Sequence, residues 1–195
     1  MYRLRIIIAS TRPGRKGPAV TAWLERAARA HEGFDCDVLD LAEVGLPLLD
    51  EPEHPSLRNY HHAHTRAWSE MVNEADAFII VLPEYNHGYP ASIKNALDYV
   101  FHEWHYKPAG LVSYGGIAGG IRSAELIKPV LTTLRMVPLN EAVPLPFFTQ
   151  HMSEEGTFEP PAEIEDSVRG MLDEMLRVAE ALEPLRERKR KELTG

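Results

Sequence analysis

The feature that most constrains this chain is the alternation of short apolar runs with longer segments of helical periodicity. Residues 3–9 form a β-branched apolar run typical of a buried strand, whereas residues 18–31 repeat apolar side chains at helical spacing. Strands that alternate with helices form a parallel sheet covered on both faces. The predicted strands are 3–9, 34–41, 76–82, 111–114 and 137–143. The predicted helices are 18–31, 60–74, 91–101, 121–135 and 162–192.

Five such strands predict a flavodoxin-like, three-layer α/β/α sandwich with a five-stranded parallel sheet. The length of 195 residues suits a single domain over residues 1–195, which ends in the long helix 162–192. Ligands of these sheets bind beyond the carboxyl ends of the strands, near the point where the strand order reverses. Three unusual loops are expected at that edge, at residues 10–17, 83–90 and 115–120.

Charge and cysteine content exclude several classes of protein. The formal net charge is −8, from 29 acidic against 21 basic residues, which argues against a general nucleic-acid binder. The single cysteine, Cys36, excludes an internal disulfide and a Cys-x-x-Cys zinc site, and it fits a reducing, cytoplasmic setting. The apolar run near the N-terminus, at about five residues, is too short for a signal peptide or a membrane span. We therefore expect no membrane association.

The first loop, with the sequence ASTRPGRKG, carries the residue types of a phosphate cradle. Hydroxyls, positive charges and glycines precede a helix whose N-terminal amides favour an anion. The candidate ligands are Ser10, Thr11, Arg12, Arg15, Lys16 and Gly17. The loop lacks the spacing of a Walker A motif and of the G-x-G-x-x-G dinucleotide fingerprint. A solvated basic turn is the alternative interpretation.

The other two loops are rich in turn residues. In the segment PEYNHG, Asn86 and Gly88 tolerate unusual backbone angles, and Tyr85 and His87 can stack on or flank a ring. The alternative is a simple turn that precedes a helix with its N-cap at Ser92. The segment SYGGIAGG has glycines that allow close approach of a ligand to the backbone, although a flexible loop has the same composition.

Taken together, the motifs resemble those of the NAD(P)H-dependent FMN reductase family, flavodoxin-like flavoproteins that include quinone and azo-dye reductases. The similar segments are S-T-R in the first loop, P-E-Y-N-H-G-Y-P-A-S-I-K-N-A-L-D in the second, and S-Y-G-G-x-A-G-G in the third. The second motif is long and specific, and the resemblance covers residues 1 to about 135. Only the helical ending of the last third is similar.

The resemblance implies that FMN is held without a covalent bond, with NADPH or NADH as the hydride donor. The phosphate would lie on Ser10, Arg12 and the loop through Gly17. The isoalloxazine edge would meet Pro83, Glu84, Tyr85, Asn86 and His87, with Ser113, Gly115 and Gly116 on the other side. This chain departs from the common family form at Lys16, Gly17 and Pro18, where many members have a polar residue. Backbone and lysine contacts would replace a hydroxyl there.

Flavin chemistry would explain why no nucleophile and base stand out in the sequence. We expect no catalytic side chain, ping-pong kinetics and a small acceptor such as a flavin, a quinone or an azo compound. Tyr85, His87 and Tyr89 are the candidates for shaping the acceptor pocket. A flavodoxin-like electron carrier without nicotinamide turnover is the alternative function. A phosphate-binding hydrolase is a third, although Cys36 lies in a strand, away from the phosphate loop.

Further expectations concern metals and partners. His54, His61, His62 and His64 lie close in sequence, but no cysteine is near, and we expect a solvated helix start or a subunit contact rather than a metal site. Residues 102–107 follow the helix after the second loop, where a partner subunit often covers this class of fold. The family resemblance also implies a homodimer or homotetramer.

Overall fold

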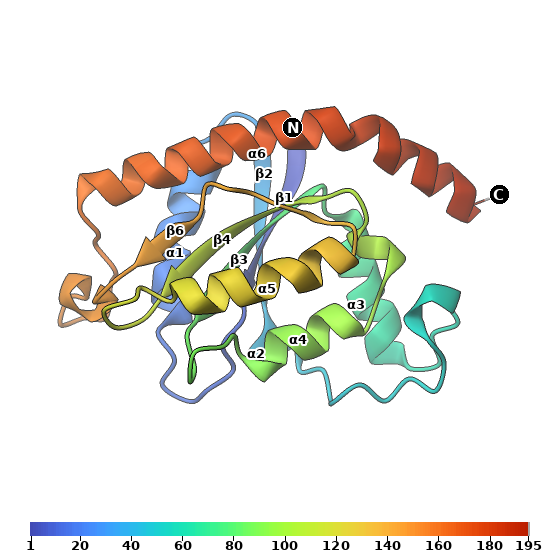
Figure 1. Ribbon diagram of the computed structural model, residues 1–195, viewed down its shortest axis with the longest axis horizontal. Coiled ribbons are helices and arrows are strands. Elements are labelled where there is room, and N and C mark those ends of the chain that lie inside the picture. The colour runs from blue at the N-terminus through green and yellow to red at the C-terminus, as the bar shows by residue number, and fades with distance from the viewer. Residues whose placement is uncertain (195) are drawn as a thin grey trace.

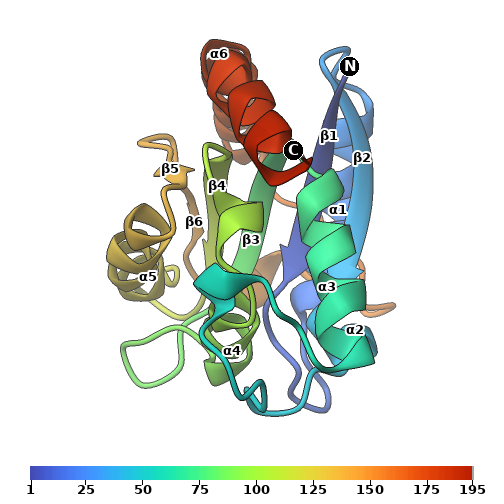
Figure 2. The ribbon, with the colours of Figure 1, turned by 90° about the vertical axis from the view of Figure 1, so that its right-hand side faces the viewer.

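The computed structural model describes residues 1–194 as one parallel sheet between two layers of helices (Figures 1 and 2). The strands are β1 (Tyr2–Ile8), β2 (Phe34–Asp40), β3 (Ala77–Pro83), β4 (Pro108–Tyr114), β5 (Val137–Pro138) and β6 (Val143–Leu145). The α-helices are α1 (Gly17–Arg29), α2 (Leu41–Val44), α3 (Ala63–Glu74), α4 (Ala91–Asp98), α5 (Ile121–Thr133) and α6 (Ala162–Thr194). Short 3-10 helices are η1 (Pro55–Leu57), η2 (His102–Trp104) and η3 (Phe148–His151).

The sheet has the strand order β2-β1-β3-β4-β5, and all of its pairs are parallel. This is the flavodoxin-like, doubly wound order, and it confirms the predicted fold class. The order reverses between β1 and β3, because the chain first runs outward to β2 and then returns to the far side of β1. The loops after β1 and β3 therefore lie side by side at the switch point, on the lower side of the molecule in Figure 1.

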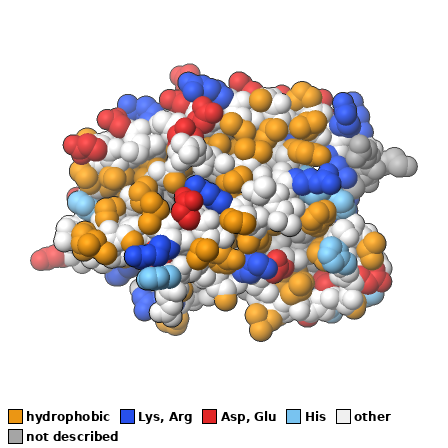
Figure 3. Space-filling model, viewed as in Figure 1, with side chains coloured by type: hydrophobic (Ala, Val, Ile, Leu, Met, Phe, Trp, Pro, Cys, Tyr) orange, Lys and Arg blue, Asp and Glu red, His pale blue; other side chains and the backbone are white. Residues whose placement is uncertain are grey.

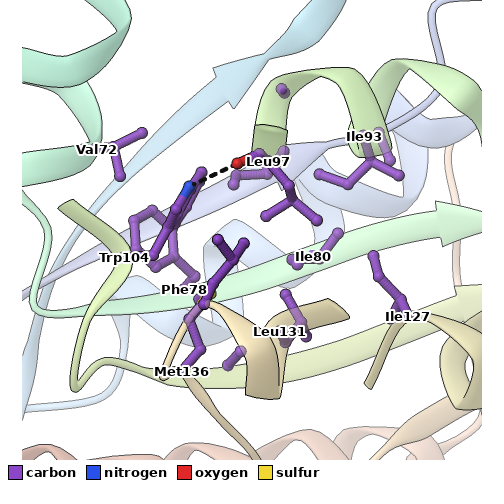
Figure 4. Packing of buried hydrophobic residues seen from close by; sticks show 14 of the residues in the cluster. Val72, Phe78, Ile80, Ile93, Leu97, Trp104, Ile127, Leu131 and Met136 are labelled. Carbon is purple, nitrogen blue, oxygen red and sulfur yellow. Dashed lines mark hydrogen bonds between the residues drawn. The ribbon is translucent and has the colours of Figure 1, made fainter. Parts of the chain in front are cut away.

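Both faces of the sheet are buried because its central strands are apolar throughout. On β3, Ala77, Ile79 and Val81 face the cluster formed with α1 and α6, whereas Phe78, Ile80 and Leu82 face the cluster formed with α3, α4 and α5. This alternation follows from the two-residue period of a strand. Figure 4 shows Trp104 packed beside Phe78 in the second cluster, with its indole bonded to Leu97 of α4.

The predicted last strand, 137–143, is wrong as a single element. Two short strands take its place. β5 pairs with the start of β4 through Val137 and Pro138, and β6 pairs with its end from Val143 to Leu145. Proline has no N–H to donate, so Pro138 and Pro144 are tolerated here because β5 and β6 share the edge of the sheet. β6 is followed by η3, and neither β6 nor η3 was predicted as a separate element.

On the face seen in Figure 3, basic, acidic and hydrophobic side chains are interspersed. Among the helices of residues 1–194, none combines the length and the apolar character needed to cross a bilayer.

Candidate functional site

The first loop turns tightly between β1 and α1. The N–H of Arg15 donates to the carbonyl of Arg12 at 3.1 Å, and Gly14 has a φ of 71°, a left-handed conformation that glycine adopts without strain. α1 begins at Gly17, with Pro18 in its first turn, and no side chain among the described residues caps it. Uncapped amides at a helix N-terminus are available to an anion. The loop therefore combines a tight turn with a helix start that carries no side-chain cap.

The charges of this loop are not equivalent. Arg12 and Lys16 are exposed to solvent. Arg15 instead forms an ion pair with Asp40, the last residue of β2. The side chains of Arg15 and Asp40 are only 20% and 10% exposed. The loop therefore carries two exposed cations and one that is held in an ion pair.

The second loop contains a two-residue hairpin. The N–H of Tyr85 donates to the carbonyl of Gly88 at 2.9 Å, and the N–H of Gly88 donates back to Tyr85 at 3.0 Å. Asn86 and His87 have φ values of 50° and 68°. Positive φ at both central residues is the type I′ pattern, which asparagine tolerates better than histidine. The hairpin holds Tyr85, Asn86 and His87 out into solvent.

Two hydroxyls tie the first loop to the second. Ser10 is fully buried, and its Oγ lies 2.6 Å from the phenol oxygen of Tyr85 in a hydrogen bond. Ser92 Oγ donates to the carbonyl of Ala9. The predicted N-cap at Ser92 is therefore wrong, because α4 begins at Ala91 after Pro90 and Ser92 is its second residue. Its hydroxyl donates to the backbone just after β1 and does not cap the start of its own helix.

The third loop is closed on itself. Ser113 is buried, and its hydroxyl donates to the carbonyl of Gly119 at 2.9 Å. Gly120 has a φ of 79°, and a Cβ there would lie 2.8 Å from the backbone nitrogen of Tyr114, so only glycine fits. Glu84 joins this loop to the second: its Oε1 accepts from Nη1 of Arg122 at 2.5 Å, and its Oε2 accepts from the Arg122 N–H at 3.3 Å.

All three loops line one cavity of about 140 Å³. Its lining residues are Arg12, Arg15, Lys16, Pro83, Glu84, Tyr85, Tyr114, Gly115 and Phe148. Sequence reasoning missed Tyr114 and Phe148, whose rings meet edge to face with centroids 4.9 Å apart. Burial, with a smaller effect of nearby Tyr85, raises the pKa of Tyr114. Tyr114 lay within the SYGG motif, but nothing in the sequence marked Phe148.

The remaining predicted residues lie around this cavity without lining it. Thr11 borders a neighbouring pocket of about 410 Å³ between α2 and α4. Gly116 is exposed at the start of its loop. Tyr89 is half-buried and packs against the core on the α4 side, although it was predicted to shape the acceptor pocket. The hydroxyls of Ser10 and Ser113 form hydrogen bonds with other protein groups.

The histidine-rich segment does not converge on a metal-binding geometry. His64 contacts Asp50 at 2.9 Å through Nε2, and its ring stacks on that of His62 with centroids 5.1 Å apart. Hydrogen bonding to His64 lowers the pKa of Asp50. Among the side chains that the structure describes, no three histidine, cysteine, aspartate or glutamate residues are placed to hold one metal ion.

The residues at the switch point fit the phosphate end of FMN. The cavity is smaller than the roughly 300–1,000 Å³ of a typical small-molecule site, so only part of the cofactor can lie within it. Three basic side chains line it, and Arg15 Nε is buried with no hydrogen-bond partner among the described residues. An N–H left without a partner in a cationic cavity suits a phosphate oxygen.

Comparison with known proteins agrees with this geometry. Residues 2–150 match the family described as NADPH-dependent FMN reductase. An NAD(P)H-dependent FMN reductase of Schizosaccharomyces pombe is 38% identical over 148 residues, which cover 74% of each chain. An FMN-dependent NADPH-azoreductase of Staphylococcus saprophyticus is 31% identical over 140 residues, 71% of this chain and 72% of that one.

Solved structures of flavoenzymes also have a similar fold. A flavoenzyme NAD(P)H:(acceptor) oxidoreductase from Paracoccus denitrificans superimposes with a TM-score of 0.74 at 19% identity, over 93% of this chain and 98% of that one. That likeness supports the fold, and the sequence matches support the activity. The chain therefore belongs to the NADPH-dependent FMN reductase family and is an oxidoreductase that uses FMN and NAD(P)H.

Proposed function

We propose that this chain holds FMN at the switch point and reduces small-molecule acceptors. The observation that carries the proposal is the cavity lined by all three loops, whose lining includes the basic residues Arg12, Arg15 and Lys16 together with Tyr85. When bound, FMN would supply the hydride and electron-transfer chemistry between NADPH or NADH and an acceptor, and we expect ping-pong kinetics. The protein supplies position and electrostatics.

The first loop would hold the phosphate. Arg12 and Lys16 would contribute charge, and the N–H of Gly17 at the start of α1 would donate a hydrogen bond, since Pro18 has no N–H and the N–H groups of Ala19 and Val20 donate to the carbonyl of Lys16. Gly17 keeps this approach open, because a Cβ there would lie 2.9 Å from Ile8 Cγ2 and 3.2 Å from the phenol oxygen of Tyr114. Ser10, which is buried, would support the loop from its inner side, and Thr11 is exposed on the loop.

The second and third loops would hold the flavin ring. The backbone from Pro83 to His87 and the glycines at 115 and 116 would border it. The Glu84–Arg122 ion pair would keep these loops at a fixed separation. No protein side chain is required as an acid or a base. The exposed Tyr85 and His87 would shape the acceptor side.

The acceptor class follows from the relatives. They include an FMN-dependent NADPH-azoreductase and a 2-hydroxy-1,4-benzoquinone reductase, both of which act on planar, conjugated substrates. We therefore propose a quinone, an azo compound or free flavin as the acceptor. The ring of Tyr85, which lines the cavity and is 38% exposed, would stack on such planar molecules.

We also propose that residues 1–195 act as one FMN-binding domain, that the enzyme works in the cytoplasm and that it forms a homodimer or a homotetramer. Leu48, Leu49 and Leu57 leave apolar side chains on the connection between β2 and α3, and Leu48 is 83% exposed. Exposed apolar side chains of this kind favour burial against another subunit.

The test is a titration of the purified protein with FMN, followed by anaerobic NADPH. We expect bound-flavin absorbance that bleaches on NADPH and recovers with a quinone. Arg12→Gln should weaken FMN binding about tenfold through loss of one phosphate contact, whereas Arg177→Gln, on the exposed face of α6, should not. Bound flavin that neither NADPH nor NADH reduces would instead favour an electron carrier, and a protein that binds no flavin would refute the proposal.

A further inference from the structure

Asp40 occupies an unexpected position for a phosphate site. It ends β2, and its carboxylate lies next to the basic loop through its ion pair with Nη2 of Arg15. Its other oxygen, Oδ1, accepts the N–H of Ala42 at 3.0 Å and caps α2. Each oxygen therefore has one partner, and the side chain is fixed from both sides.

A carboxylate near a phosphate should oppose binding by repulsion. Its presence beside the first loop therefore requires a compensating benefit. We infer that the benefit is the ordering of the Arg15 side chain, because the loop segment before it does little to restrict its conformation. Gly14 has a φ of 71°, and a side chain there would meet nothing within 4 Å. Without Asp40, the Arg15 side chain would have many rotamers, and ordering them would cost entropy when a ligand binds.

The Arg15 guanidinium keeps one donor without a partner in the described part of the chain. Asp40 takes Nη2, whereas Nε is buried and has no hydrogen-bond partner within the described residues. Arg15 also lines the cavity. A planar guanidinium that is held through one nitrogen presents its remaining donors in a fixed direction, which suits a phosphate oxygen.

We propose that Asp40 is a positioning residue, which holds the Arg15 side chain so that its Nε–H donates a hydrogen bond to the phosphate of FMN. The inference rests on the proposed function and deepens it. Asp40 would make the site select the phosphorylated flavin, because Arg15 contributes nothing to the binding of riboflavin. Arg12, Arg15 and Lys16 would together balance the charge of Asp40 and a phosphate dianion.

The two possible roles of Asp40, repulsion of the phosphate and positioning of Arg15, predict opposite changes in FMN affinity when its charge is removed. If Asp40 acted only through its charge, Asp40→Asn would tighten FMN binding, because a repulsion is removed. If it positions Arg15, the same substitution should weaken FMN binding. Asparagine is as good an N-cap as aspartate, so the cap on α2 is retained. The sign of the change separates the two roles.

The experiment measures dissociation constants of FMN and of riboflavin for the full chain, by quenching of flavin fluorescence. Asp40→Asn should weaken FMN binding about tenfold, the size of one charge-assisted hydrogen bond, and leave riboflavin binding unchanged. Asp37→Asn is the matched control: Asp37 lies on the same strand and pairs with Arg5 away from the cavity, and neither constant should change. In Arg15→Gln, the Asp40→Asn change should have no further effect on FMN.

Each outcome bears on a different claim. Unchanged or tighter FMN binding by Asp40→Asn, in a wild-type protein that prefers FMN to riboflavin, would refute the positioning role and leave the proposed function intact. Equal loss of FMN and riboflavin binding would also refute it, because it would show a general defect of the fold. A wild-type protein that binds both flavins equally would refute the phosphate site itself and the role of Asp40 with it.

Discussion

Two tryptophans cap α4, the helix that follows the second loop, and the replacement of one of them tests how this part of the fold is stabilised. α4 ends at Asp98, and the last carbonyls of a helix have no partner within it. The indole N–H of Trp68, from α3, donates to the carbonyl of Ala96 at 2.9 Å, and that of Trp104, from η2, donates to the carbonyl of Leu97 at 3.1 Å. Figure 4 shows the second of these bonds.

Trp104→Phe removes the bond at Leu97 and part of the ring. Trp104 is fully buried between Trp68 and Phe78, with ring centroids 6.0 and 5.0 Å away, so the lost volume is not refilled by solvent. A loss of roughly 40 Å³ at about 24 cal/mol per Å³ costs about 1 kcal/mol. The carbonyl of Leu97 left without its partner costs about 1–3 kcal/mol more. We expect a decrease of about 2–4 kcal/mol in the free energy of unfolding.

The assay is urea unfolding followed by far-ultraviolet circular dichroism. At a slope of about 2 kcal/mol per molar urea, the midpoint should fall by about 1–2 M. Trp23→Phe is the control, because Trp23 is also buried, but its N–H makes no hydrogen bond with any described residue. It should lose only the volume contribution, about 1 kcal/mol. Equal destabilisation by the two variants would refute the capping argument.

Two further predictions concern titratable groups. Burial, followed by the charge of His102, lowers the pKa of His105 to about 4. Between pH 6.5 and 4 the unfolded chain therefore binds more protons than the folded chain. The contribution of His105 to the free energy of unfolding is complete above pH 6.5 and falls by about 3 kcal/mol as the pH drops through this window. Urea midpoints measured from pH 7.5 to 4.5 check this, and an unchanged slope in His105→Gln would contradict it. Burial raises the pKa of the Cys36 thiol to about 11, so a disulfide reagent at pH 8 should label the denatured chain fully and the native chain very slowly. Rapid labelling of the native chain would show that β2 opens locally.

The local pattern of the sequence determined the architecture. Alternating apolar strands and amphipathic helices specify a doubly wound sheet, because a strand that is apolar on both faces, such as β3, can be buried only between two helical layers. The same pattern located the three loops at one edge. It failed at the last strand, where Pro138 and Pro144 interrupt the ladder, and it missed the four-residue helix α2, which is too short for periodicity to reveal.

The motifs determined the family, since a long specific segment such as PEYNHGYPASIKNALD carries information that needs no coordinates. What they left open is which side chain does what. Ser10, Ser92 and Ser113 were read as ligands or as a cap, but their hydroxyls bond other parts of the protein. Phe148, far along the chain, closes the cavity. Asp40 meets Arg15 across 25 residues of sequence. Hydrogen bonds and packing between distant segments depend on the final positions of whole elements, so only the tertiary structure decided them.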